Sequence, residues 1–166
     1  MWFPENVARC VLLAILLGVA GCGFQLRGTA GDGLESLNII GAGAAPRTSK
    51  TLVQALEERN VQILPAGEGV VSVHILDERS SRRTVATTDV YSAAEYELRL
   101  ELDVTISNGE NILLEGATLV SQRVYAVDSN NLSASQEEQS LLQYEMRVDL
   151  VEQLIRRVNF LARSAP

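Results

Sequence analysis

Histidine, cysteine and basic side chains are scarce in this chain of 166 residues. It holds one His and two Cys, which are too few soft ligands for a four-coordinate Cys/His zinc site. Its 14 Lys and Arg stand against 21 Asp and Glu, a formal net charge of −7. Because neutralising a phosphate backbone requires clustered Lys and Arg, this balance argues against a general nucleic-acid-binding protein. The length fits one domain and excludes an assembly of several.

The residue patterns of common enzymes are also missing. His74 falls inside an expected strand only three residues from Asp77, and the chain has no Gly-x-Ser-x-Gly elbow, which disfavours a Ser/His/Asp hydrolase. A Gly-x-Gly at residues 41–43 resembles a dinucleotide fingerprint, but Pro46 stands in place of the third Gly, so the segment is expected to be a loop. We therefore expect a protein that is not an enzyme and that holds no metal.

A single long apolar run lies at the amino terminus. Residues 10–19 are almost wholly apolar, and about ten residues cannot span a bilayer core that requires roughly 20. Small residues follow directly before Cys22, in the sequence Leu-Gly-Val-Ala-Gly-Cys, which resembles a bacterial lipobox. The alternative is a buried core helix.

The lipobox predicts three segments. Residues 1–21 are expected to be a lipoprotein signal peptide, 22–34 a lipidated tether and 35–166 a single domain. Cys22 is expected to carry a diacylglycerol and an N-acyl chain, which together anchor a protein stably, and no other cofactor is expected. By resemblance to bacterial lipoproteins, Gly23 favours transport to the outer membrane, with the domain on its periplasmic side.

The first part of the domain predicts a strand, a helix and a short extended return. The strand is expected at residues 37–40. Thr48 or Ser49 can cap a helix that ends at about Arg59, where Asn60 suits a left-handed terminus. Residues 61–64 are expected to return in an extended conformation.

The middle of the chain predicts antiparallel sheet. A strand is expected at residues 70–76. From Tyr96 to Ile106, apolar residues alternate strictly with polar ones, which is typical of a strand with one buried face. Asn108-Gly109 is a strong hairpin signal, and the return strand is expected at residues 112–125.

A long amphipathic helix is expected to end the chain. Ser135 and Glu138 match a capping box, and the helix is expected to run to about Ala162. Its apolar residues fall on one arc at 100° per residue: Leu141, Tyr144, Val148, Val151, Leu154, Ile155, Val158 and Leu161. The elements together predict an α+β two-layer sandwich, with an about four-stranded, mostly antiparallel sheet and two helices packed on one face.

Four segments carry a family resemblance: residues 22–28 (Cys-Gly-Phe-Gln-Leu-Arg-Gly), 94–98 (Ala-Glu-Tyr-Glu-Leu), 138–146 and 152–157. In this order behind a lipobox, they resemble the lipopolysaccharide (LPS)-assembly lipoprotein family LptE. The resemblance implies a non-enzymatic outer-membrane lipoprotein that plugs the LPS-translocon β-barrel LptD, helps that barrel assemble and contacts LPS. The alternative is a lipoprotein subunit of a periplasm-spanning phospholipid transport system.

The best cluster of basic residues is Arg79, Arg82 and Arg83, between two expected strands. Arginine suits the phosphates of LPS because it offers bidentate hydrogen bonds. These three residues are expected either to contact LPS or to belong to a solvated hairpin loop, and Arg123 is a further candidate contact. Members of the family studied as LPS binders carry a basic residue before the Ala-Glu-Tyr motif and another before the last helix. This chain has Thr-Thr-Asp at residues 87–89 and Ser-Ala-Ser at 133–135 there.

Overall fold

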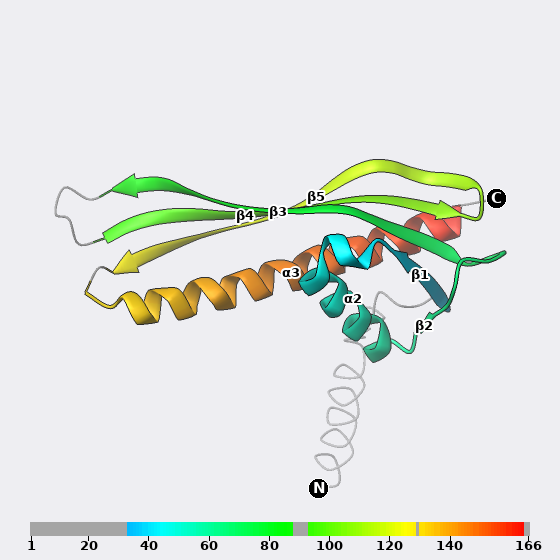
Figure 1. The fold of residues 1–166 in the computed structure, drawn as a ribbon, viewed down its shortest axis with the longest axis horizontal. Coiled ribbons are helices and arrows are strands. Elements are labelled where there is room, and N and C mark those ends of the chain that lie inside the picture. The colour runs from blue at the N-terminus through cyan, green and yellow to red at the C-terminus, as the bar shows by residue number, and fades with distance from the viewer. Residues whose placement is uncertain (1–32, 88–92, 129, 165–166) are drawn as a thin grey trace, which may run out of the picture.

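A computed structural model describes residues 33–87, 93–128 and 130–164. They form an α+β fold in which a five-stranded sheet is covered on one face by two helices (Figure 1). The strands are β1 (Ser36–Ile40), β2 (Gln62–Ile63), β3 (Val71–Thr87), β4 (Ala93–Asn108) and β5 (Asn111–Asp128). The helices are the 3-10 turn η1 (Ala42–Ala44), α2 (Pro46–Glu58) and α3 (Leu132–Ser164). The predicted signal peptide and Cys22 lie outside the described residues.

The sheet is mixed, in the order β2-β1-β3-β4-β5. The chain passes through α2 between β1 and β3, and these two strands run parallel, as strands joined by a crossover do. The segment predicted to be a short extended return is β2, which pairs with β1 in parallel. The expected sheet of about four mostly antiparallel strands therefore becomes five strands, of which only β3, β4 and β5 are antiparallel neighbours.

Strands β3, β4 and β5 form a long meander that extends beyond the rest of the sheet (Figure 1). The predicted alternation in β4 is confirmed, because Leu98, Leu100 and Leu102 are buried. The predicted hairpin is also confirmed, with Asn108 paired to Asn111. The expected end of the third strand near residue 76 was wrong, since β3 continues to Thr87.

Helix α2 begins at Pro46, before both of the predicted cap residues, Thr48 and Ser49. Pro46 occupies the first turn, where its missing N–H is no loss, and Ala45 makes no side-chain cap. Thr48 and Ser49 are instead buried within the helix, and the Ser49 hydroxyl donates to the carbonyl oxygen of Ala42 at 3.0 Å. The left-handed end at Asn60 is confirmed by its φ of 57°.

Helix α3 runs along the meander, with α2 packed beside it (Figure 1). It begins at Leu132, and the backbone N–H of Ala134 donates to the side chain of Asn131 at 3.3 Å. The predicted capping box was therefore wrong, because Ser135 lies inside the helix. Neither α2 nor α3 has an apolar stretch of the length needed to cross a membrane.

The buried face of α3 differs from the predicted arc in its first half. Leu141 and Tyr144 are 57% and 52% exposed, whereas Met146 and Leu150 are buried. The second half follows the prediction: Val151, Leu154, Ile155 and Val158 are buried against the sheet and α2.

Gly41 has a packing role in the loop between β1 and α2. Its φ is 77°, and a Cβ atom built on it would lie 2.2 Å from the carbonyl oxygen of Ile75 in β3. Only glycine fits so close an approach with a left-handed backbone. The first glycine of the Gly-x-Gly segment is thus explained by packing of the loop on β3.

Candidate functional site

The predicted arginine cluster lies in β3 rather than in a hairpin loop. Because side chains in a strand alternate between faces, the three arginines do not share one surface. Arg79 and Arg83 pair in register with Glu101 and Glu97 of β4, on the face of the sheet away from α3, called here the outer face. Arg82 is opposite Leu98 and points to the face that α3 covers. The alternative of a solvated hairpin loop was therefore wrong, because all three residues belong to a strand.

Arg79 is the centre of an ion-pair network on the outer face. Its guanidinium binds the carboxylate of Asp103, lies 3.0 Å from Asp77 and lies 3.4 Å from Glu101. The hydroxyl of Thr118 in β5 donates to the same Asp103 at 2.6 Å. The positive charge of Arg79 is thus neutralised by neighbouring acids.

Two further ion pairs extend this network along the outer face. Arg83 Nε lies 2.7 Å from Glu97 Oε1, and a second guanidinium nitrogen donates to the other carboxylate oxygen at 3.1 Å. Arg99 Nη2 lies 2.7 Å from Glu101. We call Arg79, Arg83, Arg99, Asp77, Glu97, Glu101 and Asp103 the outer ladder. It is a polar surface on which each arginine has an acidic partner.

Hydrogen bonds within the outer ladder lower the pKa values of Asp103, Glu97 and Glu101. The hydrogen bonds from Arg79 and Thr118 lower the pKa of Asp103 below its ordinary value of 3.8. The hydrogen bond from Arg83 lowers the pKa of Glu97 below 4.5, and that from Arg99 does the same for Glu101. Because these side chains are solvated, the ladder is a modest source of stability and mainly sets the charge pattern of this face.

Arg82 packs on the ring of Tyr96, on the face of the sheet that α3 covers. Its guanidinium carbon lies 4.7 Å from the ring centroid of Tyr96, a cation–π contact. It also donates to Gln139 of α3 at 3.4 Å, and Gln139 accepts a second hydrogen bond from the hydroxyl of Tyr125 at 2.7 Å. Arg82 therefore joins β3 to the first half of α3.

Arg123, the fourth predicted contact, lies in β5 on the face that α3 covers. Its Nη2 atom is 3.9 Å from Asp149 of α3, which also accepts a hydrogen bond from Ser121 at 2.7 Å. The four predicted arginines thus divide into two on each face of the sheet.

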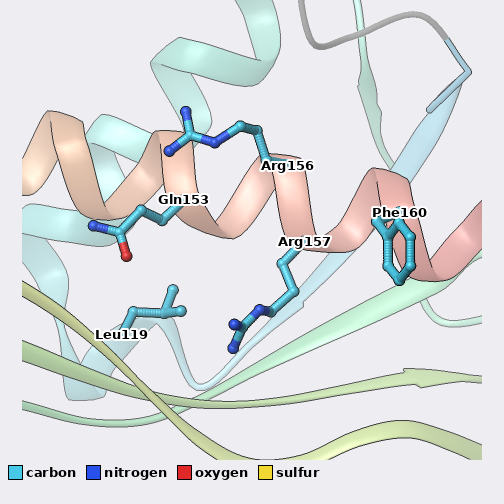
Figure 2. A pocket seen from close by; sticks show the side chains of 5 residues that line it. All are labelled: Leu119, Gln153, Arg156, Arg157 and Phe160. Carbon is cyan, nitrogen blue, oxygen red and sulfur yellow. The ribbon is translucent and has the colours of Figure 1, made fainter.

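A second basic region lies near the carboxyl end of α3. A hollow of about 340 Å³ is lined by Arg156, Arg157, Phe160 and Gln153 of α3 and by Leu119 of β5 (Figure 2). An adjoining hollow of about 450 Å³ shares Arg156 and Phe160 with it and is also lined by Asn159, Arg163 and Ser164.

Sequence reasoning missed this region. The signal was available, because residues 153–166 hold three arginines and no Asp or Glu.

The structure does not bring His74 and Asp77 together as a catalytic pair. His74 is half-buried in β3, and Asp77 is paired with Arg79. Across the described ranges, no three His, Cys, Asp or Glu side chains gather as metal ligands would.

Known proteins are similar to this chain in sequence and in architecture. The family model described as "LptE: Lipopolysaccharide-assembly" matches residues 34–158. The LPS-assembly lipoprotein LptE of Photorhabdus laumondii is 30% identical over 159 residues, covering 89% of this chain and 85% of that one. Its namesake in Pectobacterium atrosepticum is 27% identical over 151 residues, covering 88% and 80%. Rare lipoprotein B from Shewanella oneidensis has the same fold, with a TM-score of 0.68 at 19% identity over 78% of this chain and 97% of that one.

Proposed function

This chain belongs to the lipopolysaccharide-assembly family LptE, and from that premise we propose that it plugs the lumen of the LptD β-barrel, helps the barrel assemble and contacts LPS. It is a lipoprotein with a role in LPS transport and assembly. In our proposal that role is non-enzymatic, because the protein acts by occupying and stabilising a barrel. The observation that carries the proposal is the family match over residues 34–158.

The outer ladder supports a place inside a barrel. The interior of a large outer-membrane barrel is polar, so a protein that fills it needs a polar surface. Contact with the barrel wall removes water from that surface, so each of its charged side chains needs a partner of opposite charge. On the outer ladder Arg79 and Arg83 already bind Asp103 and Glu97 within the chain. We propose that this outer face lies against the barrel wall.

The proposed anchor is a lipid on Cys22. Residues 1–21 would be removed as a signal peptide, and the diacylglycerol and N-acyl chains on Cys22 would hold the domain at the periplasmic side of the outer membrane. Residues 22–34 would form the tether. Two or more acyl chains are needed for this because a single chain binds a membrane only reversibly.

The proposed LPS contacts remain Arg79, Arg82, Arg83 and Arg123. Arg83 is the most accessible, with 72% of its side chain exposed and one acidic partner. Since the four residues occupy two faces, a single LPS headgroup would engage either the pair Arg79 and Arg83, at the contact with the barrel wall, or the pair Arg82 and Arg123. Replacing each pair with alanine in the purified lipidated protein and measuring LPS retention at low and moderate salt tests this. Unchanged retention in both variants would contradict direct contact by these residues.

Depletion of the protein tests the proposed function. We expect newly made LPS to stop reaching the cell surface, measured by labelling LPS on intact cells, and complementation by the unaltered gene to restore it. Normal surface LPS after depletion would overturn the proposal. Purification of the tagged protein should recover a large β-barrel in a one-to-one complex. Recovery of an inner-membrane ABC transporter in its place would favour the alternative of a phospholipid transport system.

A further inference from the structure

The carboxyl end of α3 carries positive charge that the proposed function does not use. Arg156, Arg157 and Arg163 are exposed, and within the described ranges no carboxylate forms an ion pair with any of the three. By contrast, Arg79, Arg83 and Arg99 on the outer face all have acidic partners. These three cations lie within eight residues of one another in a chain whose net charge is −7.

An exposed aromatic ring lies among these cations. Phe160 is 69% exposed, the highest value among the large hydrophobic side chains of the described residues. It lines both hollows together with Arg156. Figure 2 shows Arg157 directed toward the strands on the side of Leu119, and Arg156 extending away from them. We call Arg156, Arg157, Phe160 and Arg163 the basic end of α3.

We propose that the basic end of α3 is a membrane-docking site that binds the headgroups of anionic phospholipids, with Phe160 inserted at the headgroup boundary. Arginine binds phosphate oxygens through parallel N–H groups, and a basic helix surface with an exposed apolar ring is the pattern of interfacial membrane binding. The two hollows that Phe160 lines contain arginine and polar or apolar residues, and none of their described lining residues is acidic.

The first described residue of the chain lies beside this site. Gly33 lies against Arg163, since a Cβ atom built on Gly33 would be 3.1 Å from Arg163 Nε. Cys22 is 11 residues before Gly33, which limits the distance from the anchor to roughly 40 Å. The inference rests on the proposed lipidation of Cys22, which would hold the basic end of α3 near the leaflet that contains the anchor. It commits to phospholipid of that leaflet as the partner.

A tryptophan probe tests the docking. The sole tryptophan, Trp2, precedes Cys22, so the mature lipidated chain has none and F160W introduces a unique fluorophore. The lipidated F160W protein is inserted into vesicles of phosphatidylcholine alone or mixed equally with phosphatidylglycerol, each with brominated acyl chains. We expect a blue shift and quenching on the anionic vesicles only. Y144W is the matched control on the same helix, and it should be quenched on neither.

Charge variants of the F160W protein test whether the arginines contribute to the docking. An arginine near an anionic membrane surface contributes about fivefold to binding, so R156Q/R157Q should lower the ratio of docked to undocked protein by about 25-fold. R47Q/K50Q removes the same charge from an exposed part of α2 and should leave the quenching unchanged. Salt at about 1 M, where the Debye length is roughly 3 Å, should abolish docking of the F160W protein.

Three results would overturn the inference. They are equal quenching on neutral and anionic vesicles, an equal loss in R47Q/K50Q, and quenching that requires LPS in place of phosphatidylglycerol at matched surface charge. Mass spectrometry of the purified chain precedes the spectra. An unmodified Cys22 would overturn both the proposed anchor and this inference, whereas a lipidated chain that does not dock would overturn this inference alone. The assay contains no barrel, so its outcome is independent of the plug function.

Discussion

The hydroxyl of Tyr125 in β5 donates a hydrogen bond of 2.7 Å to the side-chain oxygen of Gln139 in α3. Tyr125 is 4% exposed, and its ring lies 6.0 Å from that of Tyr96. The same oxygen of Gln139 accepts from Arg82 of β3. One helix side chain therefore joins the strands at both margins of the meander, at the end of the sheet where β1, β2 and α2 provide no further packing.

Tyr125→Phe should lower the free energy of unfolding by about 1 kcal/mol, the usual net value of a hydrogen bond between neutral groups. The ring and its contact with Tyr96 remain, so the loss reports the hydroxyl alone. Tyr144→Phe is the matched control, because Tyr144 is 52% exposed on α3, and it should change stability by less than about 0.5 kcal/mol. Urea denaturation measures both, and equal losses in the two variants would contradict the role given to this hydrogen bond.

Gly41→Ala should destabilise the fold by more than about 1 kcal/mol, because the new methyl group meets the carbonyl oxygen of Ile75 and the backbone is left-handed. Gly43→Ala, two residues later, places its methyl group where nothing lies within 4 Å and should be nearly neutral. Thermal denaturation followed by circular dichroism compares them. Similar melting temperatures would show that the loop after β1 can move away from β3.

The sequence predicts best those elements whose burial follows from one regular pattern. In β4, alternation from Tyr96 to Ile106 matches the two faces of a strand. The apolar face is buried, and this prediction does not depend on which element packs against it. The arginines of β3 were misjudged because proximity in sequence was taken as proximity in space. In a strand, Arg82 and Arg83 point to opposite faces.

The buried face of α3 was predicted correctly only in the part of the helix that packs on two other elements, as a core helix does. Val151 and Ile155 belong to the half of α3 that packs on both the sheet and α2, so a wide apolar arc is buried. Before Val151, buried Met146 and Leu150 are four residues apart, so the contact line turns by about 40° between them. This rotation leaves Leu141 exposed. It depends on the shape of the sheet, so the apolar pattern of the helix alone does not predict it.

Acid should weaken the fold through the outer ladder. The pKa values of Asp103, Glu97 and Glu101 are lower in the folded protein than their ordinary values of 3.8, 4.5 and 4.5, so the folded state favours the ionised forms. Their contribution is complete above about pH 4.5 and is lost as pH falls through the folded pKa values. Carboxyl carbon NMR should show Arg79→Gln raising the pKa of Asp103 while Glu97 keeps its low value.

Arg83→Gln gives the reciprocal control, since it should raise the pKa of Glu97 and leave Asp103 unchanged. This separation follows from the two arginines contacting different carboxylates. If either variant moved both pKa values equally, the ladder would be a diffuse charge field and the individual pairs would have no separate effect.

The orientation proposed for the barrel complex can be tested with two residues of nearly equal exposure. Val124 is 56% exposed and pairs with Glu97 on the outer face, whereas Leu141 is 57% exposed on α3. If the outer face lies on the barrel wall, Val124→Arg puts a long charged side chain into that contact. We expect recovery of the barrel with the tagged protein to fall about tenfold, equivalent to about 1.4 kcal/mol. Leu141→Arg adds the same side chain elsewhere and should leave recovery unchanged. Matching melting temperatures would show that both variants fold. A loss confined to Leu141→Arg would assign the wall contact to α3, contrary to the proposal.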